Sequence, residues 1–188
     1  MIRKIAIFAS GSGSNAENII SYFEKSDKFE FPLILSNKPD AYVHQRAKKF
    51  QIPSFYFTKE SFIDGNEILD FLNSYKIDSI ILAGFLLKVP EVLVQAFPNN
   101  IINIHPALLP KFGGKGMYGD NVHKAVKASG ETESGITVHY VNEHYDDGNI
   151  ILQAKCALNE LDTPESIAEK VHALEYEFFP KAIEQIWA

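Results

Sequence analysis

The sequence predicts a single α/β domain over residues 1–188, with a mostly parallel, doubly wound, Rossmann-like sheet. Apolar runs alternate with amphipathic segments through the first half, and repeated βα units of this length favour parallel strands with right-handed crossovers. Two strand-like runs separated by a short polar loop then favour an antiparallel addition to the sheet. A long C-terminal helix completes the expected fold.

The first half of the chain supplies the parallel strands. Lys4–Ala9 is a largely apolar run, which is typical of a strand buried on both faces. Pro32 weakens the second strand and suggests an edge position for it, because proline cannot donate to a sheet ladder. The expected strands cover residues 4–9, 29–35, 54–57, 78–83 and 100–105, and the expected helices cover 15–22, 41–50, 67–75 and 90–97.

The pattern changes in the second half. The segment Gly113–Gly119 is rich in glycine and predicts a mobile loop. Thr163 and Pro164 begin the last helix as N-cap and first residue. Pro180 would cost this helix a hydrogen bond to Tyr176, so a kink is expected there. The expected elements are helix 120–129, strands 135–141 and 150–157, and a final helix that ends near residue 186.

Composition argues against several classes of protein. A hydrophobic share of 46% is too high for a disordered chain. A net charge of −6 does not suit a nucleic-acid surface, which needs an excess of basic residues. No apolar stretch approaches the roughly 20 residues that span a bilayer, and the apolar run near the N-terminus is too short for a signal peptide. We expect a soluble cytoplasmic protein, monomeric or homodimeric, whose partners are small-molecule substrates.

Asn103 and His105 stand at the carboxyl end of an expected buried strand. In extended backbone, residues two apart point to the same side, and Pro106 ends the strand because it has no ladder N–H. Open α/β sheets bind ligands at the carboxyl ends of their strands. An amide and an imidazole there can hydrogen-bond a carbonyl oxygen and handle a proton. This pair therefore suits acyl or formyl transfer, in which negative charge builds on oxygen.

A turn rich in glycine and serine, Ser10–Asn15, joins the first strand to the first helix. Gly11 and Gly13 allow positive φ and a close backbone approach, and the N–H groups at a helix N-terminus bind anions. We therefore expect a phosphate site, with an ordinary turn capped by a side chain as the alternative. A nicotinamide dinucleotide is disfavoured, because its fingerprint needs an acidic residue where Ser36-Asn37-Lys38 stands.

The loop Asn142–Gly148 offers a partner for the imidazole. It joins two expected strands, and its carboxylates can reach a neighbouring strand end. Asp146 would hydrogen-bond His105 directly or through water, which raises the basicity of the ring and fixes its tautomer. An ordinary turn is the alternative interpretation of this loop.

Four other titratable residues are weaker candidates. His44 and His172 lie in helical patterns and are expected on the surface or in packing. His123 lies near the start of a helix after the glycine-rich loop, at the edge of a possible site. Glu175 in the last helix is either a solvated charge or a contact for an amine.

No metal site is expected. His139 and His144 flank Asp146, but no His-x-x-x-His pair lies on one helix. The one cysteine, Cys156, permits neither an internal disulfide nor a thiolate metal cluster, and we expect it to serve in packing.

Together these residues resemble the folate-dependent formyltransferases, and within them the phosphoribosylglycinamide formyltransferase family. The resemblance covers nearly the whole chain, and Asn103–Pro110 is its most specific part. Ala83–Phe85 is similar to the family segment beside the pterin ring. Asp146–Gly148 with Ile150–Gln153 is similar to the aspartate loop and its following strand, and Gly11–Asn15 to the substrate-phosphate loop.

The resemblance implies an activity. A formyl group would pass from 10-formyltetrahydrofolate, the cosubstrate, to the amine of glycinamide ribonucleotide (phosphoribosylglycinamide) in the synthesis of IMP, without a metal. Residues 1–103 would be the phosphate-binding half, and residues 104–188 the folate-binding and catalytic half.

The resemblance also assigns residues. Asn103, His105 and Asp146 would be catalytic, and Glu175 would meet the substrate amine. The implied phosphate-binding residues are Gly11, Ser12, Gly13, Ser14 and Asn15. The implied folate-binding residues are Leu86, Leu87, Lys88, Val89, Val141, Asn142, Glu143, His144 and Tyr145.

Some positions differ from the common family pattern. Leu86-Leu87-Lys88 replaces a commoner Met-Arg pair, and Asp147 stands where many relatives have glycine. The Gly113–Gly119 segment is longer than in many relatives and is a candidate lid. Lys111 or Lys115 is a candidate contact to phosphate or to the folate glutamate.

Three alternative functions stay open. A formyltetrahydrofolate hydrolase would keep Asn103, His105 and Asp146 and use water as acceptor, although such relatives usually carry an N-terminal regulatory domain. A transferase for aminoacyl-tRNA or a sugar nucleotide would normally carry a C-terminal domain. A ligand-binding module on this fold would have no need of a proton-handling imidazole.

Overall fold

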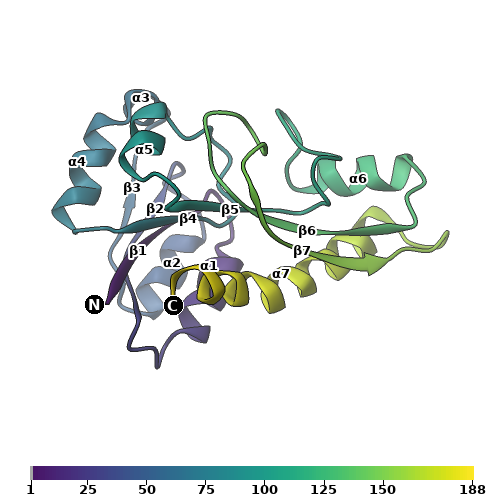
Figure 1. Cartoon of the computed structure of the whole chain (residues 1–188), viewed down its shortest axis with the longest axis horizontal. Coiled ribbons are helices and arrows are strands. Elements are labelled where there is room, and N and C mark those ends of the chain that lie inside the picture. Colours follow the sequence, from purple (N-terminus) through teal and green to yellow (C-terminus); the bar gives the residue numbers. More distant parts are fainter. Residues whose placement is uncertain (1) are drawn as a thin grey trace. The chain divides into compact units, whose positions relative to one another are not determined.

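The computed structural model describes residues 2–188 and confirms the α/β fold class. The strands are hydrogen-bonded in the order β3-β2-β1-β4-β5-β6-β7 (Figure 1). They are β1 Arg3–Phe8, β2 Phe29–Ser36, β3 Ser54–Tyr56, β4 Ser79–Leu82, β5 Ile101–His105, β6 Glu133–Tyr140 and β7 Ile150–Ala157. The helices are α1 Ser14–Tyr22, α2 Val43–Lys49, α3 Lys59–Asp64, α4 Asn66–Ser74, α5 Glu91–Ala96, α6 Asp120–Ala128 and α7 Pro164–Trp187.

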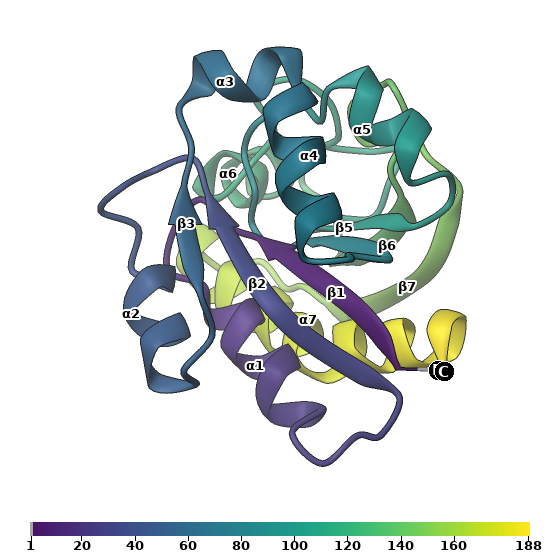
Figure 2. The ribbon, with the colours of Figure 1, turned by 90° about the vertical axis from the view of Figure 1, so that its left-hand side faces the viewer.

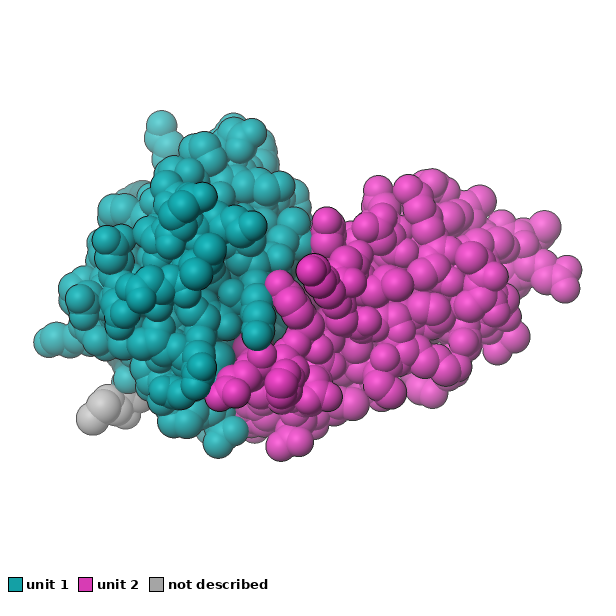
Figure 3. All heavy atoms as spheres, turned by 90° about the horizontal axis from the view of Figure 1, so that it is seen from above, with its two compact units in different colours: residues 1–103, 187–188 teal, residues 104–186 magenta. Residues whose placement is uncertain are grey.

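The chain forms two compact units, which Figure 3 shows in different colours. The first comprises residues 1–103 with 187–188, and the second comprises residues 104–186. The boundary falls within β5, so this strand contributes to both units. Fully buried apolar side chains fill each unit, among them Leu33 in the first and Phe179 in the second.

The first unit is a doubly wound parallel sheet with β1 inside it. β1 pairs in parallel with β2 on one side and with β4 on the other. Helices α1 and α2 cover one face of this sheet, and α3, α4 and α5 cover the other (Figure 2). Ile5, Ile7 and Phe8 are therefore 0% exposed, as expected for a strand covered on both faces.

Aromatic rings near the end of β1 anchor the segment that follows β4. The ring centroid of Phe85 lies 5.4 Å from that of Phe8 and 5.2 Å from that of Phe62, both in edge-to-face geometry. Phe57 stacks on Phe62 at 4.8 Å. Such pairs stabilise a fold by about 0.5–1.5 kcal/mol beyond the burial of their area. Phe85 thereby fixes the start of the candidate folate segment Leu86–Val89.

The expected edge position of the second strand is wrong. β2 lies between β3 and β1, and β3 occupies the edge. The register explains how Pro32 is accommodated: Lys4 pairs with Glu30, whereas Ala6 pairs with Leu33. One additional β2 residue therefore bulges from the ladder. A bulge removes the need for a ladder N–H at proline, and periodicity alone does not reveal it.

Helix α3 lies where no helix was expected. Thr58 caps it by accepting a hydrogen bond from Ser61 N at 3.2 Å. Gly65 ends it in the left-handed region with a φ of 76°. A helix this short has too few residues for a clear helical periodicity, although both capping residues were visible in the sequence.

The second unit contains the antiparallel pair that the sequence predicted. β6 pairs with β7, with Gly135 opposite Lys155 and Thr137 opposite Gln153. Helices α6 and α7 lie on opposite sides of this pair (Figure 1). α7 is assigned as helix without a break through Pro180, so the expected kink stays a prediction. None of the helices within residues 2–188 has the length and apolarity needed to cross a bilayer.

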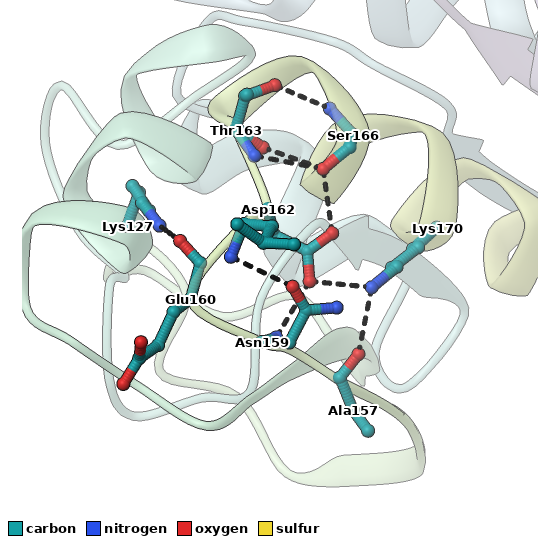
Figure 4. A network of polar contacts seen from close by, with 9 residues as sticks. Lys127, Ala157, Asn159, Glu160, Asp162, Thr163, Ser166 and Lys170 are labelled. Carbon is teal, nitrogen blue, oxygen red and sulfur yellow. Dashed lines mark hydrogen bonds and ion pairs between the residues drawn. The ribbon is translucent and has the colours of Figure 1, made fainter.

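A polar network fixes the start of α7 (Figure 4). Thr163 and Ser166 cap the helix reciprocally, with each hydroxyl accepting from the other residue's N–H at 3.2 and 3.0 Å. Asp162 is 6% exposed and lies 2.7 Å from Lys170 Nζ. The hydrogen bond from Lys170, then those from Asn159 N–H and the Ser166 hydroxyl, lower the pKa of Asp162 to about 2.

We predict that Asp162→Asn lowers the free energy of unfolding near pH 7, because it removes the charge that Lys170 and the helix start stabilise. The unfolded-state pKa of aspartate is about 3.9, above the folded value of about 2. The stabilisation is therefore complete above about pH 4 and is lost as the pH falls towards 2. Urea unfolding at a series of pH values measures it.

Asp70→Asn is the matched control, because Asp70 is an exposed carboxylate on α4. The difference in the free energy of unfolding between Asp162→Asn and wild type should shrink as the pH falls. The corresponding difference between Asp70→Asn and wild type should stay small. A pH-independent difference for Asp162→Asn would contradict the charge-based account.

Candidate active site

The chain after β5 is fixed by two polar side chains from the β6–β7 pair. Thr137 Oγ1 donates to Ala107 O at 2.7 Å and accepts from Leu109 N–H at 3.0 Å. Gln153 donates from Nε2 to Leu109 O at 2.9 Å. The Leu109–Pro110 peptide bond is cis. Thr137 is fully buried, so the backbone directly after His105 has partners inside the second unit.

His105 is buried at the end of β5, with 3% of its surface exposed. Its Nε2 lies 2.8 Å from Phe112 O. A carbonyl only accepts hydrogen bonds, so Nε2 carries the proton. Nδ1 faces Asp146 Oδ2 at 3.5 Å. An imidazolium formed here would therefore have an acceptor beside each ring nitrogen.

The Asp146 carboxylate lies close to two imidazoles and one backbone amide. Its Oδ2 accepts from Gly114 N–H at 2.9 Å, and its Oδ1 lies 3.7 Å from His139 Nε2. Nδ1 of His139 lies 2.8 Å from Tyr140 O and donates to it. The carboxylate expected to pair with His105 is thus close to it, and it also lies near His139, which the sequence analysis considered only as a metal ligand.

Both partners of His105 lie on backbone in the left-handed region. Phe112 has a φ of 56° and Asp146 a φ of 52°, values that few residues other than glycine adopt. A Cβ on Gly113 would come within 2.6 Å of Leu109 Cδ2 and 3.3 Å of Asp146 Cβ, so a glycine permits the close approach of these segments. Such conformations cost about 1–3 kcal/mol and persist where the surroundings enforce them, often at functional sites.

Burial lowers the pKa of His139 below its usual value. The hydrogen bond to Tyr140 O and the charge of Asp146 act in the opposite direction, and His105 adds to the lowering. His139 is 2% exposed. Near neutral pH it is therefore a neutral ring beside the carboxylate, with Nδ1 carrying its proton.

The glycine-serine turn precedes α1 as expected, and the helix begins at Ser14. Gly13 is the N-cap residue with a φ of 71°, and it has no side chain to cap the helix. The Ser12 hydroxyl accepts from Ser14 N–H at 3.4 Å. The turn thus combines a helix N-terminus with serine hydroxyls. That arrangement is the one that binds anions at helix N-termini.

The two candidate folate segments lie in different units. Leu86–Val89 belongs to the first unit and has no regular structure. Leu86 N–H donates to Ser10 Oγ at 2.9 Å, and Ser10 N–H donates to Gly84 O at 3.0 Å. This segment is therefore tied to the beginning of the glycine-serine turn. Lys88 is exposed and Val89 is buried.

Val141–Tyr145 belongs to the second unit and forms the first part of the loop between β6 and β7. Asn142 Oδ1 accepts from His144 N–H at 2.8 Å, which tightens the turn that leads to Asp146. Glu143, His144 and Tyr145 are exposed.

Glu175 has a histidine partner on α7. His172 Nδ1 lies 3.0 Å from Glu175 Oε2, and the His172 ring lies 4.3 Å from that of Tyr176. The hydrogen bond with Glu175 raises the pKa of His172. Burial lowers the pKa of His123, and Glu175 partly opposes this. His172 is thus a partly exposed residue, 44% of its side chain being accessible, that lies beside the candidate amine contact.

Sequence reasoning missed three groups around His105 and Asp146. Phe112 O and Gly114 N–H are backbone groups, so the residue type at these positions gives no signal for them. His139 had a usable signal, because it follows Gly135 and Thr137 at a spacing of two on β6 and so faces the same side of the strand. His44 instead contacts Ser54 and a backbone carbonyl, as a packing residue would.

Among residues 2–188, no group of three or more His, Cys, Asp or Glu side chains is arranged to hold a metal ion. The ring nitrogens of His105 and His139 that face away from Asp146 are each bonded to a backbone carbonyl. Cys156 is half-buried, and burial raises the pKa of its thiol.

Comparison with known proteins places the chain among formyl transferases. The sequence profile of the formyl transferase family matches residues 3–183. The chain is 41% identical over 187 residues to the chloroplastic phosphoribosylglycinamide formyltransferase of Arabidopsis thaliana, which covers 96% of this chain and 64% of that protein. It is 38% identical over 190 residues to phosphoribosylglycinamide formyltransferase of Bacillus subtilis, with 98% and 95% covered. The chain thus spans less than two thirds of the plant protein and nearly all of the bacterial one.

A solved structure gives the same result for the fold. Glycinamide ribonucleotide transformylase 1 from Geobacillus kaustophilus superposes with a TM-score of 0.91 at 32% identity, covering 100% of both chains.

We predict that Asp146→Asn lowers the pKa of His139 further, because the carboxylate opposes the effect of burial on this ring. A pH titration of the His139 Cε1–H signal by NMR measures the shift. Asp147→Asn, which neutralises the neighbouring exposed carboxylate, should leave the titration unchanged. A His139 that titrates above an ordinary histidine, or that does not respond to Asp146→Asn, would refute the assigned contact.

Proposed function

The chain belongs to the formyl transferase family, and on that premise we propose that it transfers a formyl group from 10-formyltetrahydrofolate to the amine of glycinamide ribonucleotide. The names of its relatives at 41% and 38% identity support this choice of substrates. The observation that carries the proposal is His105, held between Phe112 O and the carboxylate of Asp146 on the strand that bears Asn103. The reaction would serve purine synthesis in the cytoplasm.

The proposed reaction exchanges one C–N bond for another. The acceptor amine attacks the formyl carbon, and the formyl oxygen takes up negative charge. Collapse of the tetrahedral intermediate breaks the bond to N10 of the folate. The proton that the amine loses is taken up by N10, so atoms and charge balance. The rate depends chiefly on how well the oxyanion is stabilised.

Asn103 and His105 are the proposed donors to that oxyanion. The Asn103 amide supplies an N–H, and His105 supplies the proton on Nε2. Because Nε2 donates to Phe112 O at 2.8 Å, the oxyanion must displace or share that bond. A charged acceptor favours this exchange, since hydrogen bonds to ionised groups are about twice as strong as neutral ones.

Asp146 is the proposed partner for positive charge on His105. Its Oδ2 lies 3.5 Å from Nδ1, where a carboxylate stabilises an imidazolium. The hydrogen bond from Gly114 N–H helps to fix the orientation of the carboxylate. We also assign to Asp146 the ordering of a water that carries the proton from the amine to N10.

The remaining candidate residues would bind the substrates. The start of α1 at Gly11–Asn15, whose N-cap residue is a glycine, suits the ribonucleotide phosphate. Glu175, whose side chain is 13% exposed, suits an amine. Leu86–Val89 and Val141–Tyr145 lack regular structure, so their backbone groups can serve the pterin. Folate acts as cosubstrate, and the proposed steps use no metal.

One assay tests the proposed function. The purified protein is supplied with 10-formyltetrahydrofolate, with and without glycinamide ribonucleotide, and release of tetrahydrofolate is followed. We predict release that depends on the acceptor. Release without the acceptor would identify a hydrolase, and no release in either case would leave a binding module.

His105→Asn is the control that ties the activity to this chain. It keeps a polar side chain at the end of β5 but removes the donor and the proton-handling ring. Losing such a group typically lowers kcat by about 10²–10³. Activity that survives this substitution would come from other residues or from a contaminant.

A further inference from the structure

Helix α2 holds the glycine-serine turn through three successive residues. Val43 N–H donates to Gly11 O at 3.2 Å, and Arg46 Nε–H donates to Ser12 O at 2.7 Å. A Cβ on Gly13 would overlap the side chain of Val43, so only glycine permits this approach. The helix and the turn lie in the same unit.

These contacts decide where the amide hydrogens of the turn point. In a trans peptide the carbonyl oxygen and the following N–H point in opposite directions. Because the carbonyls of Gly11 and Ser12 are turned towards α2, the N–H groups of Ser12 and Gly13 are turned away from it. Successive backbone N–H groups with this arrangement form an anion-binding concavity.

Arg46 links the turn to the start of α1. Its guanidinium forms an ion pair with Glu17 and lies 5.0 Å from the ring centroid of Tyr42. Glu17 N–H in turn donates to Gly13 O at 2.9 Å. A planar guanidinium can bind a carbonyl and a carboxylate at the same time, whereas a lysine ammonium is a point charge on a flexible stem.

The charges behind the turn sum to a positive value. Lys49 Nζ lies 2.7 Å from Glu17 Oε1, so this one carboxylate is paired with both Arg46 and Lys49. Two cations and one anion leave one positive charge in surplus. The Lys49 side chain is 68% exposed, so solvent screens its charge, and the hydrogen bond from Arg46 to Ser12 O is the contact that acts on the turn.

We propose that Arg46 is a positioning residue for the substrate phosphate. It fixes the Ser12–Gly13 peptide so that its N–H meets the phosphate, and it does not touch the ligand itself. This inference rests on the phosphate-binding role proposed for the turn, and it names the residue outside the turn on which that role depends.

The test compares Arg46→Ala with Lys49→Ala. Each variant removes one cation that pairs with Glu17, but only Arg46→Ala removes the hydrogen bond to Ser12 O. Arg46→Ala should raise KM for glycinamide ribonucleotide by about tenfold, equivalent to ~1.4 kcal/mol. Its kcat and its KM for formyltetrahydrofolate should stay within about twofold of wild type, because the catalytic groups are unchanged. Lys49→Ala should change kcat and both KM values by less than about twofold.

A binding readout separates this inference from the proposed function. Titration of wild type and variants with ribose 5-phosphate, followed by ³¹P NMR, should give about tenfold weaker binding for Arg46→Ala alone. If wild type binds ribose 5-phosphate through Arg46 but transfers no formyl group, the proposed reaction fails and the positioning role stands. If wild type transfers formyl and Arg46→Ala binds as tightly as wild type, the positioning role fails.

Two further results would overturn the inference. An equal rise in KM for both variants would mean that net charge matters and orientation does not. A fall in kcat with unchanged KM would mean a general structural role. Arg46→Lys keeps a cation beside Glu17 and should weaken binding by about threefold, and it carries the same test if Arg46→Ala does not fold.

Discussion

A single carboxylate, that of Asp146, organises the candidate active site. It lies 3.5 Å from His105, 3.7 Å from His139 and 2.9 Å from Gly114 N. These contacts join the end of β5, the end of β6 and the loop before α6 within one unit. An ionised carboxylate only accepts hydrogen bonds, and Gly114 N–H donates one to it, while the ring nitrogens of His105 and His139 that face it become donors only when the rings are protonated. The left-handed backbone of Asp146 is the conformational cost of this position.

Both candidate sites share one construction principle: side chains on regular elements hold irregular backbone. Thr137 and Gln153 fix the chain after β5, and Arg46 fixes the turn before α1. Rigid elements thereby set the geometry of loops that would otherwise have many conformations. For His105 the backbone is itself a partner, since Phe112 O determines its tautomer. The proposed chemistry then requires that the substrate compete with a carbonyl for the Nε2 proton.

Sequence predicted the parts of this structure that side-chain type and periodicity encode. Alternating βα units gave the parallel sheet, and Asn103-x-His105-Pro106 marked the strand end. Asp146 was placed beside His105 by chemistry and loop position. Backbone partners were not predictable, because any residue at position 112 or 114 carries the same C=O and N–H. The bulge at Pro32 and the hydrogen bond from Arg46 to Ser12 O were not predictable either. Each depends on a strand register or a helix position that forms only in the tertiary structure.

The central claim is that His105 and Asp146 act as one unit, and a double-mutant cycle on kcat tests it most directly. His105→Asn, Asp146→Asn and the double variant are compared in formyl transfer, with folding checked by circular dichroism. Residues that act together are strongly non-additive, so the double variant should be at most a few times slower than the slower single variant. Losses that multiply, with the double variant slower by the product of both, would show that the two residues act independently and would contradict the account.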